Sequence, residues 1–150
     1  MMSQRVGRHL DMFVTAAGGL TSGVLALGTA LLLKAAVDTE GAGPTAATLS
    51  DAFSLFFGAA IGLAAGSASA AFAARTGPRI LTGLTAGFLG YALILAPTLI
   101  ATAPSDVSLP ESISTAALAA ALATPFILLG ATVGASIRGY RKTDPYRHAP

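Results

Sequence analysis

The side chains in this sequence that could take part in chemistry are mostly hydroxyl groups, and they lie within long apolar runs. They are Thr21, Ser22, Ser67, Ser69, Thr85, Tyr91, Thr98 and Thr124. A serine nucleophile needs a neighbouring base, but the two histidines, His9 and His148, lie near the ends of the chain. The Gly-x-Ser-x-Gly pattern of a nucleophile elbow is also absent. We therefore expect no catalytic residue, and we expect the hydroxyls to bond to backbone carbonyls or neighbouring helices.

Groups that change charge or hold metals are missing from the middle of the apolar runs. No Asp, Glu, His or Arg lies there, and the chain has no cysteine. An ionisable side chain within the membrane is the usual marker of proton or ion coupling. We therefore expect no metal, no cofactor and no ion-coupled transport. Lys34 lies close to the end of a run, where its ammonium can reach water while its stem lies along lipid.

Four uncharged runs dominate the chain and cover residues 12–33, 52–74, 80–103 and 112–137. Each exceeds the roughly 20 residues that cross about 30 Å of hydrocarbon as a helix, and none alternates as β-barrel strands do. Charged residues make up 11% of the chain, compared with about 25% in soluble domains. The sequence therefore predicts an all-α integral membrane protein, a four-transmembrane-helix bundle in a single membrane domain of residues 1–150. The expected helices cover about 12–37, 52–74, 79–103 and 110–138.

Small residues recur in these runs at a spacing that favours close helix packing. Gly58, Gly62, Gly66 and Ala70 lie four apart, so they form one stripe on a helix. Because helices in lipid associate through small side chains, we expect residues 52–74 to form the central helix. Further helix-packing positions are expected at Gly19, Gly23, Gly83, Gly87, Gly130 and Gly134.

A second interpretation assigns the small residues to a groove or a water-filled path. Pro97 and Pro125 each free a backbone carbonyl and can kink their helices, and broken helices build transporter sites. Tyr91 and Lys34 are the polar side chains that such a path would use.

The connections between the runs carry helix start and stop signals. Ser50 or Asp51 is expected to cap the second helix. Gly77 and Pro78 suit a tight turn that makes the second and third helices antiparallel neighbours. Residues 108–111 read Ser-x-x-Glu, a capping box for the fourth helix. The first run has about 22 residues, longer than the apolar core of a signal peptide, so we expect the first helix to be retained.

Basic residues are distributed unequally between the two sides of the expected bundle. Of the nine, only Lys34 lies on the side away from the termini. The others are Arg5, Arg8, Arg75, Arg79, Arg138, Arg141, Lys142 and Arg147. Because Lys and Arg in short loops favour the cytoplasmic side, we expect a multi-pass protein of the cell membrane with both termini in the cytoplasm. These residues flank apolar spans and form no separate basic face, so nucleic acid is not an expected partner.

Two segments of the chain resemble each other. Residues 19–25 read GLTSGVL and residues 83–89 read GLTAGFL, and the same offset aligns Gly66 with Gly130 and Ala71 with Ala135. Two explanations stay open, namely two tandem helical hairpins that arose by duplication and chance similarity among common residues.

The leading functional hypothesis is a non-enzymatic membrane protein. It would act as a homo-oligomer or as an accessory subunit in the assembly of a membrane complex. Its expected partners are the lipid bilayer and other membrane protein subunits. The alternative is a small passive permease or channel formed by oligomerisation. A defined co-purifying partner would favour the first hypothesis, and solute flux through the reconstituted protein would favour the second.

Overall fold

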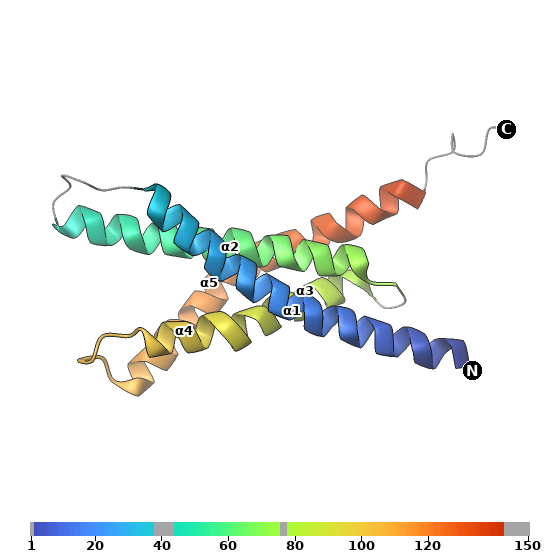
Figure 1. Cartoon of the computed structure of the whole chain (residues 1–150), viewed down its shortest axis with the longest axis horizontal. Coiled ribbons are helices and arrows are strands. Elements are labelled where there is room, and N and C mark those ends of the chain that lie inside the picture. The colour runs from blue at the N-terminus through green and yellow to red at the C-terminus, as the bar shows by residue number, and fades with distance from the viewer. Residues whose placement is uncertain (1, 38–43, 76–77, 143–150) are drawn as a thin grey trace.

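The protein is all-α, and the predicted bundle of four long apolar helices is confirmed. The structure, a computed structural model, describes residues 2–37, 44–75 and 78–142. In chain order its elements are α1 (Met2–Ala36), α2 (Pro44–Ala73), α3 (Arg79–Gly90), the π-helical segment η1 (Tyr91–Leu95), α4 (Ala96–Ala101) and α5 (Leu109–Lys142) (Figure 1). The stretches long and apolar enough to cross a membrane are His9–Ala36, Thr48–Ala73, Arg79–Ala101 and Leu109–Arg138.

The second helix begins earlier than its apolar run indicates. The prediction that Ser50 or Asp51 caps it is wrong, because α2 begins at Pro44 and both residues lie inside the helix. Proline suits the first helical position, since an N–H there would have no partner within the helix. Asp51 instead forms a salt bridge with Lys34 of α1, with 3.0 Å between Nζ and Oδ2. This ion pair joins the C-terminal end of α1 to the N-terminal part of α2.

The third span is not one regular α-helix but α3, η1 and α4 in succession. In η1 the backbone N–H of Ala96 bonds to the carbonyl of Tyr91, five residues earlier. Pro97 follows at the start of α4. A proline lacks the N–H that would bond to the carbonyl four residues earlier, and its ring clashes with that carbonyl. The wider π-turn accommodates Pro97 without breaking the span. Pro125, by contrast, lies inside a continuous α5.

The connections follow the sequence signals in part. The carboxylate of Glu111 accepts hydrogen bonds from the backbone N–H and the hydroxyl of Ser108, at 2.9 and 2.8 Å. This is the carboxylate half of the predicted capping box at the start of α5. Pro78 precedes the first residue of α3, and Gly77 lies outside the described residues.

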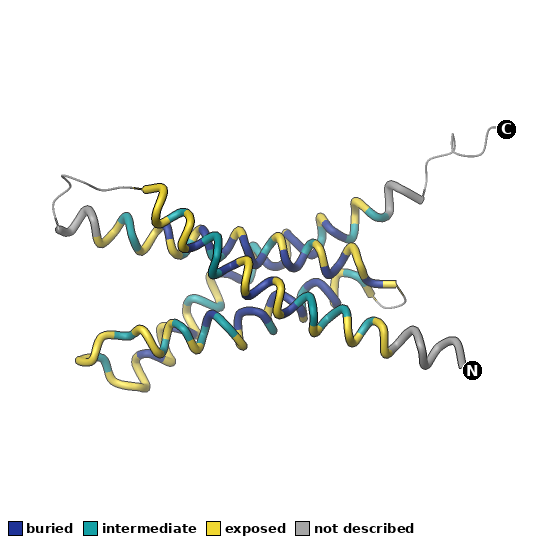
Figure 2. The backbone as a smooth tube through the Cα atoms, viewed as in Figure 1, coloured by how far each residue is buried: buried dark blue, intermediate teal, exposed yellow. Residues whose placement is uncertain are grey.

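α2 is the helix on which the others pack. It contacts α1, α3 and α5, and α1 also contacts α3 and η1. The helices cross near their middles and diverge toward their ends (Figure 1). Buried residues concentrate at this crossing (Figure 2). Its largest fully buried side chains are Leu63 of α2 and Ile127 of α5, which belong to one core cluster with Tyr91 and Leu95 of η1.

The two helical hairpins, α1–α2 and α3–α5, do not pack equivalently. The sequence similarity aligns Gly66 with Gly130. Gly66 lies against Ser22 of α1, the other helix of its own hairpin, whereas Gly130 lies against Ala64 of α2. These two residues, which correspond in the sequence, therefore meet different neighbours.

Candidate functional site

The small-residue stripe of α2 lies directly against α1. A Cβ built on Gly58 would lie 2.5 Å from Cα of Ala30, and one built on Gly66 would lie 2.6 Å from the hydroxyl oxygen of Ser22. Gly62, between them, meets the α1 backbone just as closely. Backbone atoms cannot move aside unless the two helices separate. α1 and α2 therefore touch backbone to backbone over about two helical turns.

Glycines of the other helices face carbonyl oxygens of α2. A Cβ on Gly130 or Gly134 of α5 would overlap the carbonyl oxygen of Ala64 or Ala68. Gly83 of α3 meets another α2 carbonyl oxygen in the same way, at 2.7 Å from the built Cβ. In each case a glycine Cα–H points toward an oxygen, the geometry of a weak hydrogen bond between packed helices. The small residues thus bring backbones together on three sides of α2.

The two predicted packing glycines of α1 face the third span rather than α2. A Cβ on Gly19 would lie 2.8 Å from the side chain of Leu89, and Gly23 meets η1 in the same way. Ala70 extends the α2 stripe to Gly18, whose built Cβ would lie 2.8 Å from the Ala70 methyl carbon. α1 therefore packs in a corner formed by α2 and the third span.

Gly28 of α1 differs from the other glycines whose surroundings the structure describes. A Cβ built on it meets nothing within 4 Å. Its neighbours one helical turn away, Val24 and Leu32, are exposed apolar side chains. Gly28 is therefore not used in packing within the chain. In the sequence it is one of several glycines in the first run, and only its contacts distinguish it.

Most of the hydroxyl groups bond within their own helix, to carbonyls three or four residues earlier. These hydroxyls belong to Thr21, Ser69, Thr85, Thr98 and Thr124. Two others bond between helices. Tyr91 donates to the carbonyl of Ala116 in α5 at 2.5 Å, and Ser22 donates to the carbonyl of Leu63 in α2 at 3.4 Å. These hydroxyls therefore take part in the backbone bonding and packing of the bundle.

Ser67 is the remaining hydroxyl of this set, and it is fully buried. Its oxygen has no hydrogen-bond partner among the described residues. The oxygen lies so close to Gly87 of α3 that a Cβ built there would overlap it, and Ile127 of α5 borders the same space. Ser67 thus fills the space beside Gly87 at the junction of three helices.

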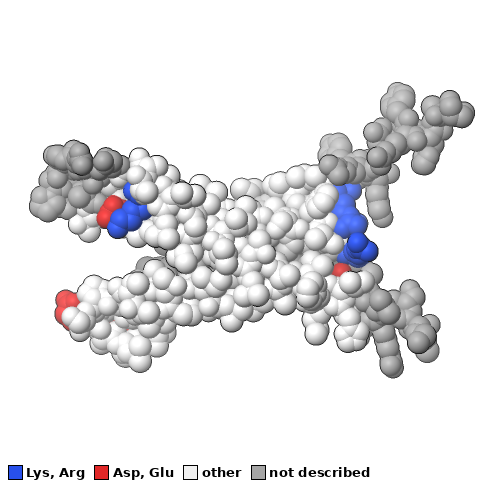
Figure 3. Space-filling model, in the orientation of Figure 1, with Lys and Arg blue, Asp and Glu red and all other residues white. Residues whose placement is uncertain are grey.

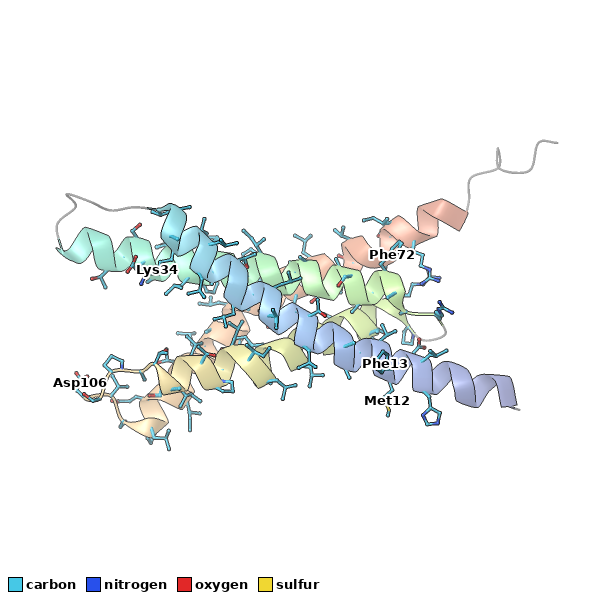
Figure 4. The ribbon with its side chains drawn as sticks, in the orientation of Figure 1. Met12, Phe13, Lys34, Phe72 and Asp106 are labelled. Carbon is cyan, nitrogen blue, oxygen red and sulfur yellow. The ribbon has the colours of Figure 1, made fainter. Side chains whose placement is uncertain are left out.

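The residues assigned to a path or to kinks do not come together. Lys34 lies near one end of the bundle, opposite to the end that carries Phe72 (Figure 4). Its side chain is 46% exposed and forms the salt bridge with Asp51. Pro97 and Pro125 are both exposed on the outside of their helices, whereas Tyr91 is buried. These side chains therefore do not line a common path within one chain.

Arg138 has a structural role that the sequence analysis missed. Its guanidinium donates to the carbonyls of Phe72 and Ala74 at 2.6 and 2.7 Å, and it lies 5.9 Å from the centre of the Phe72 ring. The last carbonyls of a helix lack donors within the helix, and a basic side chain can satisfy them. Arg138 therefore caps the C-terminal end of α2. The only signal in the sequence was positional, because the fourth run ends on the side where the second run ends.

Charged side chains gather at the two ends of the bundle, and the middle is uncharged (Figure 3). One end carries Arg75, Arg79 and Arg138, together with Asp11 of α1. The opposite end carries Lys34 and the acidic residues Asp51, Asp106 and Glu111. Among the described residues, no group of three or more His, Asp or Glu could hold a metal ion.

Comparison of the chain with models of known protein families, with curated proteins and with solved structures finds no match. The contacts of this chain are therefore the observations from which a function can be argued.

Proposed function

We propose that this four-span membrane protein acts without enzymatic activity, by associating with other transmembrane helices and first of all with copies of itself. The observation that carries the proposal is the open space around Gly28. The other glycines whose surroundings the structure describes bring helices of the same chain together, whereas Gly28 contacts no other helix of the chain. A second copy supplies the helix that this position lacks.

The argument rests on what a glycine costs in a helix. A glycine in the interior of a helix makes the folded protein less stable, by about 0.5–1 kcal/mol, than an alanine at the same position. Where a neighbouring helix approaches closely, that cost is offset by the contact it permits. Gly28 is flanked by the exposed side chains of Val24, Leu25, Leu31 and Leu32, so it forms a notch between larger apolar residues. A notch of this kind suits the ridge of another transmembrane helix.

The matched pair Gly28→Leu and Gly62→Leu tests self-association. Gly62 lies against the α1 backbone, so Gly62→Leu should damage the fold of each chain. Gly28→Leu should leave the fold intact and lower the mass of the purified assembly, measured by light scattering in mild detergent. Wild-type mass for a folded Gly28→Leu protein would rule out assembly through this face of α1.

We further propose that both termini lie in the cytoplasm of a cell whose membrane the protein spans. The distribution of charge supports this orientation. Arg75, Arg79 and Arg138 lie at the end where the second and fourth spans end and the third begins. Among the described residues, the basic side chain at the opposite end is that of Lys34, which is paired with Asp51. Basic residues of short loops favour the cytoplasmic side.

A passive permease or channel formed between copies is the second candidate. At one end of the bundle, α1 and α2 diverge from α4 and the start of α5 (Figure 1). The surface is notched between these two pairs (Figure 3), and this notch is the observation that favours a path. Within one chain the crossing is filled by Leu63 and Ile127. A path would therefore run between copies. Glycerol flux into vesicles that contain only the wild-type protein would support this function, and its loss in Gly28→Leu would tie it to assembly.

A further inference from the structure

Three arginines lie at one end of the bundle, on or just after three different helices; Arg138 lies about one turn before the end of α5 at Lys142. Arg138 caps α2 through its bonds to the carbonyls of Phe72 and Ala74. Arg75 follows α2, and its backbone N–H donates to Oδ1 of Asp11 at 3.1 Å. Arg79 is the first residue of α3. Figure 3 shows these basic side chains as one group at this end of the molecule.

The group carries three positive charges, and the carboxylate of Asp11 lies at the same end and accepts the bond from the Arg75 backbone, so positive charge is in excess there among the described residues (Figure 3). The salt bridge between Lys34 and Asp51 lies at the opposite end. The start of α3 adds to the positive potential, because Pro78 precedes it without a side-chain cap and its first turn holds no acidic residue. The free N–H groups of a helix N-terminus favour an anion in the same way as the guanidinium groups do.

The position of the arginines along the spans indicates which anion fits. Arg79 begins the span 79–101 and Arg138 ends the span 109–138, so the guanidinium groups lie at the depth of lipid headgroups. Exposed apolar side chains lie beside them, namely Phe72, Ile80 and Ile137. A ligand that contacts both sets needs a phosphate joined to hydrocarbon chains, whereas a soluble phosphate would use only the arginines.

We propose that the ends of α2, α3 and α5 form a binding site for an anionic phospholipid. Arg75 and Arg79 bind the headgroup phosphate, while Arg138 holds α2 in place and presents its remaining N–H donors. Planar guanidinium groups match the geometry of phosphate oxygens and bind them through paired hydrogen bonds. The acyl chains lie along Phe72, Ile80 and Ile137.

Native mass spectrometry of the full-length protein in a neutral detergent tests the site, with phosphatidylglycerol or phosphatidylcholine added. The wild type should retain phosphatidylglycerol in preference to phosphatidylcholine. Arg79→Gln should weaken phosphatidylglycerol binding about fivefold, and the double variant with Arg75→Gln should weaken it roughly twenty-five-fold. Lys34→Gln removes the same charge at the opposite end and should leave the binding unchanged. Arg138 is kept, because its loss would disturb the end of α2.

Three results would overturn the proposal. The first is equal retention of the two lipids by the wild-type protein, a measurement that needs no variant to fold. The second is a similar loss of phosphatidylglycerol in Lys34→Gln and Arg79→Gln. The third is displacement of phosphatidylglycerol by inorganic phosphate at equal concentration, which would identify a site for soluble anions instead of a lipid site.

Discussion

Replacement of Gly62 by leucine is the most direct test of how α1 and α2 pack. A Cβ built on Gly62 would lie 2.6 Å from the carbonyl carbon of Leu25, and Cα of Ala26 is nearer still. Carbon atoms attract best at about 3.5–4 Å. The two helices must therefore separate by about 1 Å, since backbone atoms cannot rotate away. A gap of that size forfeits a quarter to a half of the dispersion attraction between the atoms concerned.

The cost of this separation has two parts. Overpacking of a close contact typically costs about 1–3 kcal/mol. Two hydrogen bonds also cross the interface, from Ser22 to the carbonyl of Leu63 and from Thr29 to the carbonyl of Gly58. Such bonds between membrane helices contribute about 0.6 kcal/mol each. We therefore expect Gly62→Leu to lower the free energy of unfolding by about 3 kcal/mol.

Unfolding by sodium dodecyl sulfate in mixed micelles, followed by circular dichroism, measures this change. Two variants serve as controls. Gly28→Leu adds the same side chain where nothing lies within 4 Å, and Ile61→Leu changes a side chain that is 55% exposed next to Gly62. Both variants should reach their unfolding midpoint at close to the same mole fraction of sodium dodecyl sulfate as the wild type. If Gly62→Leu also does so, the backbone contact between α1 and α2 is absent and the reasoning fails.

The remaining predictions concern a hydrogen bond, the orientation and transport. Tyr91→Phe removes the bond to the Ala116 carbonyl and should lower the free energy of unfolding by about 1 kcal/mol in the same titration; an unchanged midpoint would contradict the role of that bond. Because the chain has no cysteine, Ser105→Cys should react with an impermeant thiol reagent in intact cells and Thr143→Cys only after lysis; the reverse pattern would invert the topology. Purified protein in vesicles should show no solute uptake driven by a pH or sodium gradient, with or without Lys34→Gln, and gradient-driven uptake would refute this prediction.

The number of spans follows from the sequence because a membrane imposes a simple requirement. A helix that crosses hydrocarbon must carry about 20 apolar residues, and charged residues interrupt the chain between such runs. The spacing of Gly58, Gly62 and Gly66 also indicates which face of α2 is made of small residues. It does not indicate which helix lies on that face, because small residues occur in all four runs.

The helix ends and the irregular turn were harder to predict, for physical reasons. Pro44, Ser50 and Asp51 all carry helix-start signals, and hydropathy does not distinguish between them because they lie at or beyond the end of the apolar run. Pro97 predicts a disturbance in the third helix, but a kink and a π-turn both relieve the clash of its ring with the preceding turn. The structure has the π-turn, η1, directly before it.

Gly28 and Gly62 differ in whether contacts within the chain account for them. Both are glycines within long apolar runs, but only Gly62 belongs to the stripe of small residues four apart for which helix packing is predicted. Gly62 is explained by the fold, since α1 lies against it. Gly28 is not explained by the fold, yet it lowers helix stability as any interior glycine does. A substitution that leaves the chain folded while weakening self-association would therefore support the proposed assembly, and Gly28→Leu is the substitution for which the structure leaves room.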